Sequence, residues 1–128
     1  MKKRRKPNLK NENSRTWKKK ADDLWAAKIH DLGYCEICGR TGKMDAHHII
    51  SRTRLNFRHN LNNGISLCSR CHRFDADVSP HVDSFGAENF LEALKVKCPD
   101  KYRWYQDNKH DKRQRVETYK EAYSRLTT

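Results

Sequence analysis

The chain has 128 residues, which is enough for one small domain with an appended element. Hydrophobic residues make up 35% and charged residues 34%, so the core is small and a structural metal is an expected source of folding free energy. The net charge of +12 predicts attraction to polyanions, above all nucleic acid, and no apolar run is long enough to predict a secretory leader or a membrane span.

The first segment of the chain is polar and rich in lysine and arginine. Because like charges in a block repel one another, it predicts a flexible basic arm over residues 1–15. Helical periodicity follows over residues 16–32, with Thr16 as the expected cap and Gly33 placed to end the helix. The apolar side chains expected on the buried face of this helix are Trp17, Ala21, Leu24, Ile29 and Leu32.

The middle of the chain predicts two short strands and a helical turn. The strands are expected at residues 44–50 and 64–67, separated by a loop rich in asparagine and arginine at 51–63. Residues 69–76 predict one or two turns of helix. The expected order is therefore strand, loop, strand and helix.

The last third of the chain is predicted to be helical. Residues 86–97 have amphipathic periodicity that Pro99 interrupts, and a short helical segment around Trp104 follows. A last helix is expected over residues 112–126, where apolar side chains recur at helical spacing. We expect these helices to pack on the core as a C-terminal extension, residues 81–128.

Four of the five cysteines form two Cys-x-x-Cys pairs, Cys35 with Cys38 and Cys68 with Cys71. Two intervening residues let both sulfurs of a pair reach one ion from a single turn, and two pairs supply the four thiolates of a structural zinc. We therefore predict a Cys₄ zinc site. Cys98 has no such neighbour and is interpreted as a packed free thiol.

Three histidines next to these cysteines are surplus to the zinc. His47 and His48 are neighbours on a predicted strand, so their side chains are expected on opposite faces. One can then bind a metal while the other keeps a free nitrogen nearby, which suits a general base. His72 directly follows Cys71 and is placed to complete such a metal site. In the alternative interpretation the histidines are polar surface residues, or one of them supports the zinc.

The stretch CEICGRTGKMDAHHIISRTRLNFRHNLNNGISLCSRCH, residues 35–72, resembles the HNH endonucleases, the ββα-metal nucleases. The segments AHHIIS, NNGISLC and CxxCH carry the resemblance, which is greatest to small Cys₄-zinc members from phages. The expected fold is α+β and mostly helical. A small ββα-metal core with its zinc site, within residues 16–80, is flanked by N- and C-terminal helices.

The resemblance implies a role for each matching residue. His47 and His72 would bind the catalytic divalent ion, and His48 would be the general base that activates water. Asn63 would fix the loop between the strands and orient that base. The residues that match the structural zinc ligands are Cys35, Cys38, Cys68 and Cys71.

The chain departs from the family pattern at one position. Many relatives have a further histidine about one helical turn after His72, where this chain has Ala76. Asp75 and Asp77 flank that position and are candidate carboxylate ligands. The alternatives are that water fills the coordination position and that both aspartates belong to a solvated helix end.

The expected function is a metal-dependent DNA endonuclease that nicks or cuts duplex DNA with one catalytic ion, Mg²⁺ or Mn²⁺, with Ni²⁺ or Zn²⁺ as alternatives. The competing interpretation is a non-catalytic zinc module that binds nucleic acid or a partner protein. We expect a cytoplasmic monomer or weak homodimer, phage-encoded, with DNA and phage packaging or recombination proteins as partners. The candidate phosphate contacts are Arg52, Arg54, Arg58, Arg70 and Arg73.

Overall fold

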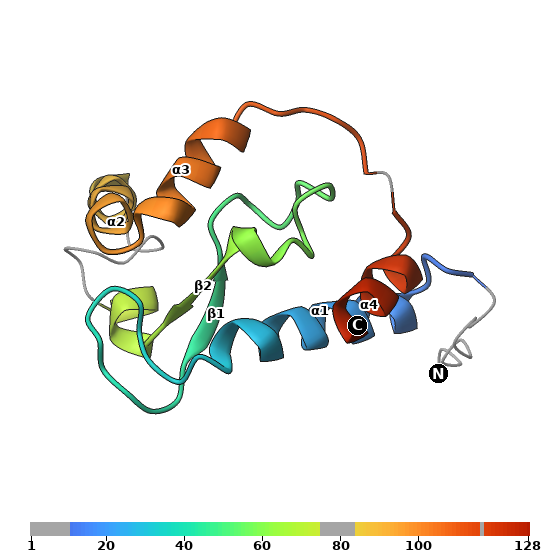
Figure 1. Ribbon diagram of the computed structural model, residues 1–128, viewed down its shortest axis with the longest axis horizontal. Helices are drawn as coiled ribbons and strands as arrows, with labels where there is room; N and C mark the ends of the chain where they lie inside the picture. Colours follow the sequence, from blue (N-terminus) through green and yellow to red (C-terminus); the bar gives the residue numbers. More distant parts are fainter. Residues whose placement is uncertain (1–10, 75–83, 116) are drawn as a thin grey trace, which may run out of the picture.

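The computed structural model describes residues 11–74, 84–115 and 117–128 (Figure 1). Its elements are α1 (Arg15–His30), β1 (Asp45–His48), the 3₁₀ turn η1 (Leu61–Asn63), β2 (Gly64–Leu67), the π-helical turn η2 (Arg70–Phe74), α2 (Ser84–Lys97), α3 (Pro99–Asn108) and α4 (Tyr119–Thr127). The fold is α+β and mostly helical, as predicted. Within the described residues, no helix has the length and apolar character needed to cross a bilayer.

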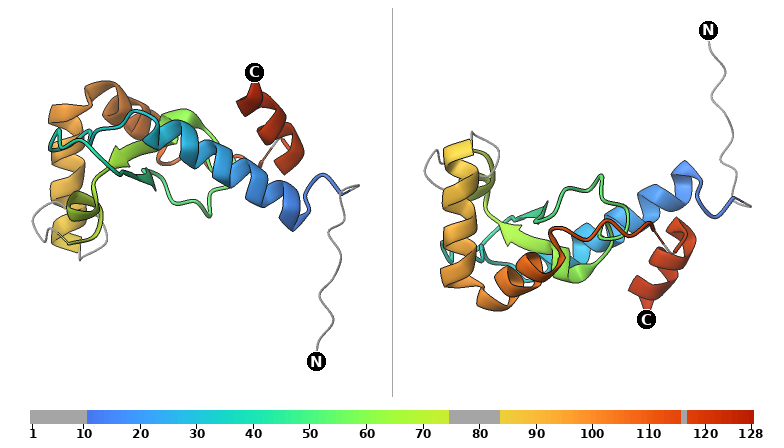
Figure 2. Two further views of the ribbon diagram at one scale, coloured as in Figure 1. Left: turned by 90° about the horizontal axis from the view of Figure 1, so that it is seen from below. Right: turned by 90° about the horizontal axis from the view of Figure 1, so that it is seen from above.

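The molecule is built around the antiparallel pair β1 and β2. His48 lies opposite Gly64, and His47 lies opposite Ile65. Figures 1 and 2 show α2 and α3 at one end of the molecule and α4 at the other, with α1 reaching from the sheet to α4. The side chains of β2 are buried throughout, so this strand is the centre of the fold.

The cap of helix α1 lies two residues earlier than the sequence suggested. The Ser14 hydroxyl, not Thr16, accepts a hydrogen bond from the backbone N–H of Trp17 at 3.4 Å. The buried face consists of Ala21, Trp25 and Ile29, which are spaced four residues apart. The predicted face was therefore wrong in part, and Leu32, beyond the end of the helix, is 45% exposed.

Gly64 allows α1 to lie directly on the sheet. A Cβ at this position would come within 2.2 Å of Ile29 Cδ1 and 2.9 Å of Trp25 Cζ2. Real Cβ atoms do not approach so closely, and a packed core resists such insertions. His48 is the residue that pairs with Gly64 across the sheet. The absence of a side chain at Gly64 therefore lets Trp25 lie close to His48.

The cysteine pairs and the C-terminal helices share one core. Phe90 and Leu94 of α2 pack with Ile65 and Leu67 of β2 in a cluster that also holds three of the zinc-pair cysteines. On the side of α3, a network of polar contacts joins Lys101 to Glu36 and the strand. Lys101 Nζ lies 2.8 Å from Glu36 Oε1 and donates to the Gly64 carbonyl at 2.9 Å.

Helix α4 starts seven residues later than the sequence predicted. A reciprocal capping box between Thr118 and Glu121 fixes its first turn. Upstream, the Asp111 carboxylate accepts a hydrogen bond from the backbone N–H of Arg113 at 2.9 Å, a turn that competes with helix formation. Residues 112–115 therefore run outside any helix, and the predicted start at residue 112 was wrong.

The end of the predicted arm is part of the folded structure. The Asn13 side chain accepts a hydrogen bond from the backbone N–H of Tyr119 at 3.2 Å, and the Glu12 carbonyl accepts one from Lys120 at 3.0 Å. These contacts join the start of α1 to the start of α4. Residues 1–10 of the arm lie outside the described residues.

Candidate nuclease site and zinc cluster

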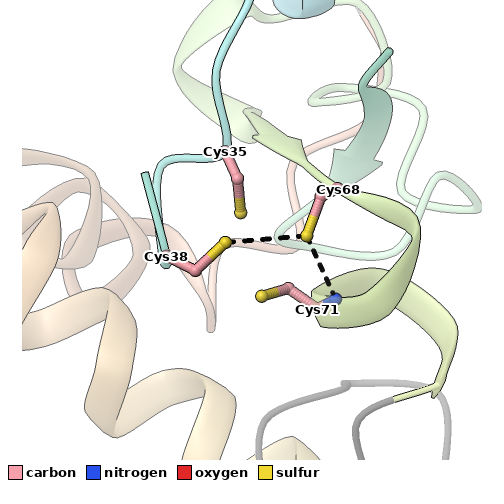
Figure 3. Close-up of side chains that lie close together, drawn as sticks. All are labelled: Cys35, Cys38, Cys68 and Cys71. Atoms are coloured by element: carbon pink, nitrogen blue, oxygen red, sulfur yellow. Dashed lines mark hydrogen bonds between the residues drawn. The ribbon is translucent and has the colours of Figure 1, made fainter. Parts of the chain in front are cut away.

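The four paired cysteines converge where the loop that bears Cys35 and Cys38 meets the end of β2 and η2 (Figure 3). Their sulfur atoms all lie within 4.8 Å of one another, and the sulfurs of Cys38 and Cys68 are 3.7 Å apart. In a tetrahedral site with Zn–S bonds of about 2.3 Å, adjacent sulfurs lie about 3.8 Å apart. The spacing fits one zinc ion, and it is too long for a disulfide, whose sulfurs are about 2 Å apart.

The charges of the four thiols show why an ion belongs at this point. Burial opposes ionisation of Cys35, but backbone hydrogen bonds from Cys38, Cys68 and Ile37 lower its pKa to about 7. Burial and the neighbouring Cys68 sulfur raise the pKa of Cys71. A Zn²⁺ ion at this point would offset the repulsion among the thiolates that bind it.

The fifth cysteine lies beside this cluster but is not part of it. The Cys98 thiol lies 3.7 Å from the Glu36 carbonyl, and burial raises its pKa. It packs against the apolar cluster that Ile65, Leu67, Phe90 and Leu94 form next to the paired cysteines, here called the zinc-side core.

The adjacent histidines of β1 face opposite sides of the strand, as strand geometry requires. The ring of His47 lies 5.1 Å from the ring of His72 and 5.4 Å from that of Phe90, measured between centroids. On the other side, the ring of His48 stacks on Trp25 with a centroid distance of 3.9 Å and an interplanar angle of 8°. The two histidines therefore occupy separate environments.

A backbone carbonyl fixes the tautomer of His48. Its Nε2 lies 2.9 Å from the carbonyl oxygen of Arg58. Because a carbonyl only accepts hydrogen bonds, Nε2 carries the proton, and Nδ1 keeps its lone pair. Burial lowers the pKa of His48, and the nearby Arg58 guanidinium lowers it further, against the opposing effect of the carbonyl. The neutral ring is therefore ready to accept a proton at Nδ1.

Asn63 secures the loop that supplies this carbonyl. Its amide nitrogen donates to the carbonyls of Ile50 at 2.9 Å and Phe57 at 3.2 Å, and its oxygen accepts from the Ile50 N–H at 2.6 Å. The side chain is fully buried. One amide thus joins the two ends of the loop between β1 and η1.

A carboxylate on α1 holds the same loop from outside. Asp22 forms a bidentate ion pair with Arg58, with N–O distances of 2.8 and 2.9 Å, and its Oδ1 lies 2.7 Å from His59 Nε2. Burial opposes ionisation of Asp22, but the hydrogen bonds from Arg58 and His59 outweigh it and lower its pKa. The Arg58 side chain is only 12% exposed. The Arg58 guanidinium is thus paired with a carboxylate of α1, and its role as a phosphate contact stays a prediction.

A second carboxylate, on β1, contacts His72. Asp45 Oδ2 lies 3.1 Å from His72 Nδ1. Since a carboxylate accepts hydrogen bonds, this contact places the proton on Nδ1, the arrangement found in carboxylate–histidine–metal sites. Asp45 and His47 are two residues apart on the strand and share a face. His47, His72 and Asp45 thus form one polar group next to the zinc-side core.

Sequence reasoning missed three residues of this site, and the signals differ. Asp45 had a signal, because residues two apart on a strand face the same side. Trp25 was not among the residues predicted for the buried face of α1, and its stacking on His48 carries no local signal. Asp22 reaches Arg58 across 36 residues of sequence, and periodicity does not predict such a contact.

The remaining predicted residues lie around the edges of the site. Arg52 and Arg70 are exposed, and Arg54 lines a hollow beside the loop. Arg73 lies in η2. Asp75, Ala76 and Asp77 lie outside the described residues.

Comparison with known proteins identifies the segment that carries this geometry. Residues 35–75 match the model of the HNH endonuclease family. The match includes both cysteine pairs, His47, His48, Asn63 and His72, so the predicted resemblance to the HNH endonucleases is confirmed over this segment. Searches of curated proteins and of solved structures gave no match.

The zinc assignment makes a direct prediction. Cys68→Ser should remove one of four ligands, and the purified variant should lose its zinc and its cooperative thermal unfolding, because binding of a structural zinc contributes roughly 10–16 kcal/mol to folding. Zinc content by mass spectrometry and melting by circular dichroism measure both. Cys98→Ser is the matched control and should keep one zinc per chain. A folded, zinc-loaded Cys68→Ser protein would contradict the assignment.

Proposed function

We propose that this protein is a metal-dependent DNA endonuclease that hydrolyses a phosphodiester with His48 as the general base. The observation that supports this most is the hydrogen bond from His48 Nε2 to the Arg58 carbonyl at 2.9 Å. It leaves Nδ1 as the basic atom of a neutral ring. The carbonyl contact, the stack on Trp25 and the lowered pKa of His48 together support a role as a base.

In the proposed reaction, His48 Nδ1 removes a proton from a water molecule as the water oxygen attacks the scissile phosphorus. The bond from phosphorus to the 3′-oxygen breaks, and the 3′-oxygen takes a proton from solvent water, which leaves 5′-phosphate and 3′-hydroxyl ends. Trp25 and the Arg58 carbonyl keep the ring in one orientation, so proton transfer needs no reorganisation of the base. Asn63 and Asp22 maintain the loop that bears the carbonyl.

The catalytic metal would be held by His47 and His72, whose rings approach each other. A divalent ion there would stabilise negative charge on the phosphoryl group and the leaving oxygen. We propose Mg²⁺ or Mn²⁺, and the two imidazoles favour Mn²⁺ of this pair, since Mg²⁺ prefers oxygen ligands. Asp45 acts as a positioning residue through the Nδ1 of His72.

The net charge of the chain supports DNA as the substrate, and the resemblance supports a phage origin. The net charge of +12 suits duplex or branched DNA, and one base with one ion serves one strand, so a monomer would nick. We propose a phage-encoded enzyme with weak sequence preference that acts in the host cytoplasm, beside packaging or recombination proteins. The basic helical flanks support this proposal.

The first experiment separates a nuclease from a non-catalytic zinc module. His48→Ala should lower the rate of plasmid nicking in Mn²⁺ by at least about 100-fold, the usual contribution of a general base, while zinc content and DNA affinity stay unchanged. The exposed His110, which carries no motif, provides the control His110→Ala, which should nick like the unmodified protein. Equal nicking by both variants would remove His48 as the base.

The second experiment addresses Asp45. Asp45→Asn keeps the shape of the side chain but weakens the acceptor that orients His72, so Mn²⁺ affinity should fall by about 10–100-fold. Isothermal titration of the zinc-loaded protein with Mn²⁺ measures this without any turnover. Glu92→Gln, on α2, removes the same charge elsewhere and should leave Mn²⁺ affinity unaltered. The same affinity in the Asp45 and Glu92 variants would mean that Asp45 does not support the metal.

A further inference from the structure

A basic hollow lies between the loop after β1 and the segment that joins α3 to α4. Its lining contains four cationic side chains, and no acidic residue belongs to it among the residues that the structure describes. The lining residues are Thr53, Arg54, Leu55, Asn56, Lys112, Arg113, Gln114 and Arg115. The hollow is thus formed by two segments almost 60 residues apart in the sequence, and one of them belongs to the HNH match.

Three nitrogen donors in this lining lack an acceptor. Arg54 Nη2, Asn56 Nδ2 and Arg115 Nη1 are shielded from solvent and have no hydrogen-bond partner in the described part of the chain. Buried donors are normally paired, and leaving one unpaired is unfavourable. The three side chains thus carry donors that no acceptor in the described residues satisfies, and they line a hollow that is open to a ligand from outside the chain.

Two of these donors belong to arginine side chains that aromatic rings hold in place. The Arg54 guanidinium lies 5.7 Å from the centroid of the Phe57 ring, and the Arg115 guanidinium lies 4.7 Å from that of Tyr119. Arg113 is different, because its Nε lies 2.7 Å from the Asp111 carboxylate, which offsets its charge. Arg54 and Arg115 are therefore the pre-positioned charges of the hollow, and guanidinium groups suit phosphate oxygens.

We propose that this hollow binds a phosphate group of the DNA backbone other than the one that is cut. The inference rests on the proposed function, because it takes DNA as the ligand. The loop that lines the hollow continues to Arg58, whose carbonyl holds His48. A phosphate bound by Arg54, Asn56 and Arg115 would therefore fix the DNA backbone against the same loop that orients the base.

The test compares two glutamine variants with the same change of charge. Gln114→Glu places a carboxylate in the lining, whereas Gln106→Glu places one on an exposed position of α3 outside it. Binding of a fluorescent DNA duplex, without added divalent ions, should weaken about 5–10-fold more in Gln114→Glu than in Gln106→Glu. The slope of log affinity against log salt should also become shallower by about 0.9, the loss of one phosphate contact.

A second pair guards against an indirect effect of the inserted charge. Arg115→Gln removes one donor of the hollow, and Arg103→Gln removes an exposed arginine of α3. The first should reproduce the weaker binding and shallower slope, with zinc content and melting temperature as checks of folding. Equal affinities and slopes within each folded pair would overturn the proposal.

The source of the phosphate is tested separately. If titration with inorganic phosphate shifts the amide resonances of residues 53–56 and 112–115 while both glutamine variants bind DNA equally, the hollow serves a free anion and the DNA assignment is wrong. Neither measurement needs cleavage. If the unmodified protein does not nick DNA but Gln114→Glu weakens DNA binding, the nuclease proposal alone is wrong. If the unmodified protein nicks DNA but Gln114→Glu binds DNA as well as it does, the proposal for the hollow alone is wrong.

Discussion

The hydrogen bond from the ring of His48 to the carbonyl of Arg58 is the interaction on which the proposed chemistry depends. It sets the tautomer, and the surrounding structure keeps it in place. Asn63 joins the ends of the loop that bears the carbonyl, and Asp22 holds that loop against α1. Trp25 stacks on the ring from the same helix. Helix α1 lies outside the HNH match, so residues beyond the family segment position its proposed base.

The cysteine cluster has a structural role, and the histidines have the proposed catalytic role. The four sulfurs close the ends of the β1–β2 unit, and zinc would offset the limited apolar core that the composition allows. This arrangement leaves β1 free to present His47 on one side and His48 on the other. Asp45 adds a carboxylate that contacts His72 on the His47 side of the strand.

Short sequence patterns predicted β2 and the meeting of the cysteine pairs. The limits of β2 and the convergence of the cysteine pairs agree with the sequence, because strand alternation and metal-ligand spacing act over a few residues. The partners of His48 could not be predicted, since Trp25 and Arg58 lie 23 and 10 residues away along the chain. The start of α4 was also missed, because the capping box at Thr118 outweighs helical periodicity upstream.

The state of the His48 ring is the most direct test of the account. A titration of its ring nitrogens by ¹⁵N nuclear magnetic resonance, in the zinc-loaded protein, reports both the tautomer and the pKa. Because burial lowers the pKa of His48, its neutral form should already prevail at about pH 6.5, the usual pKa of histidine, and at every higher pH. The proton of the neutral ring should be on Nε2. A ring that is still cationic at pH 7, or a neutral ring protonated on Nδ1, would contradict the assignment of His48 as the base.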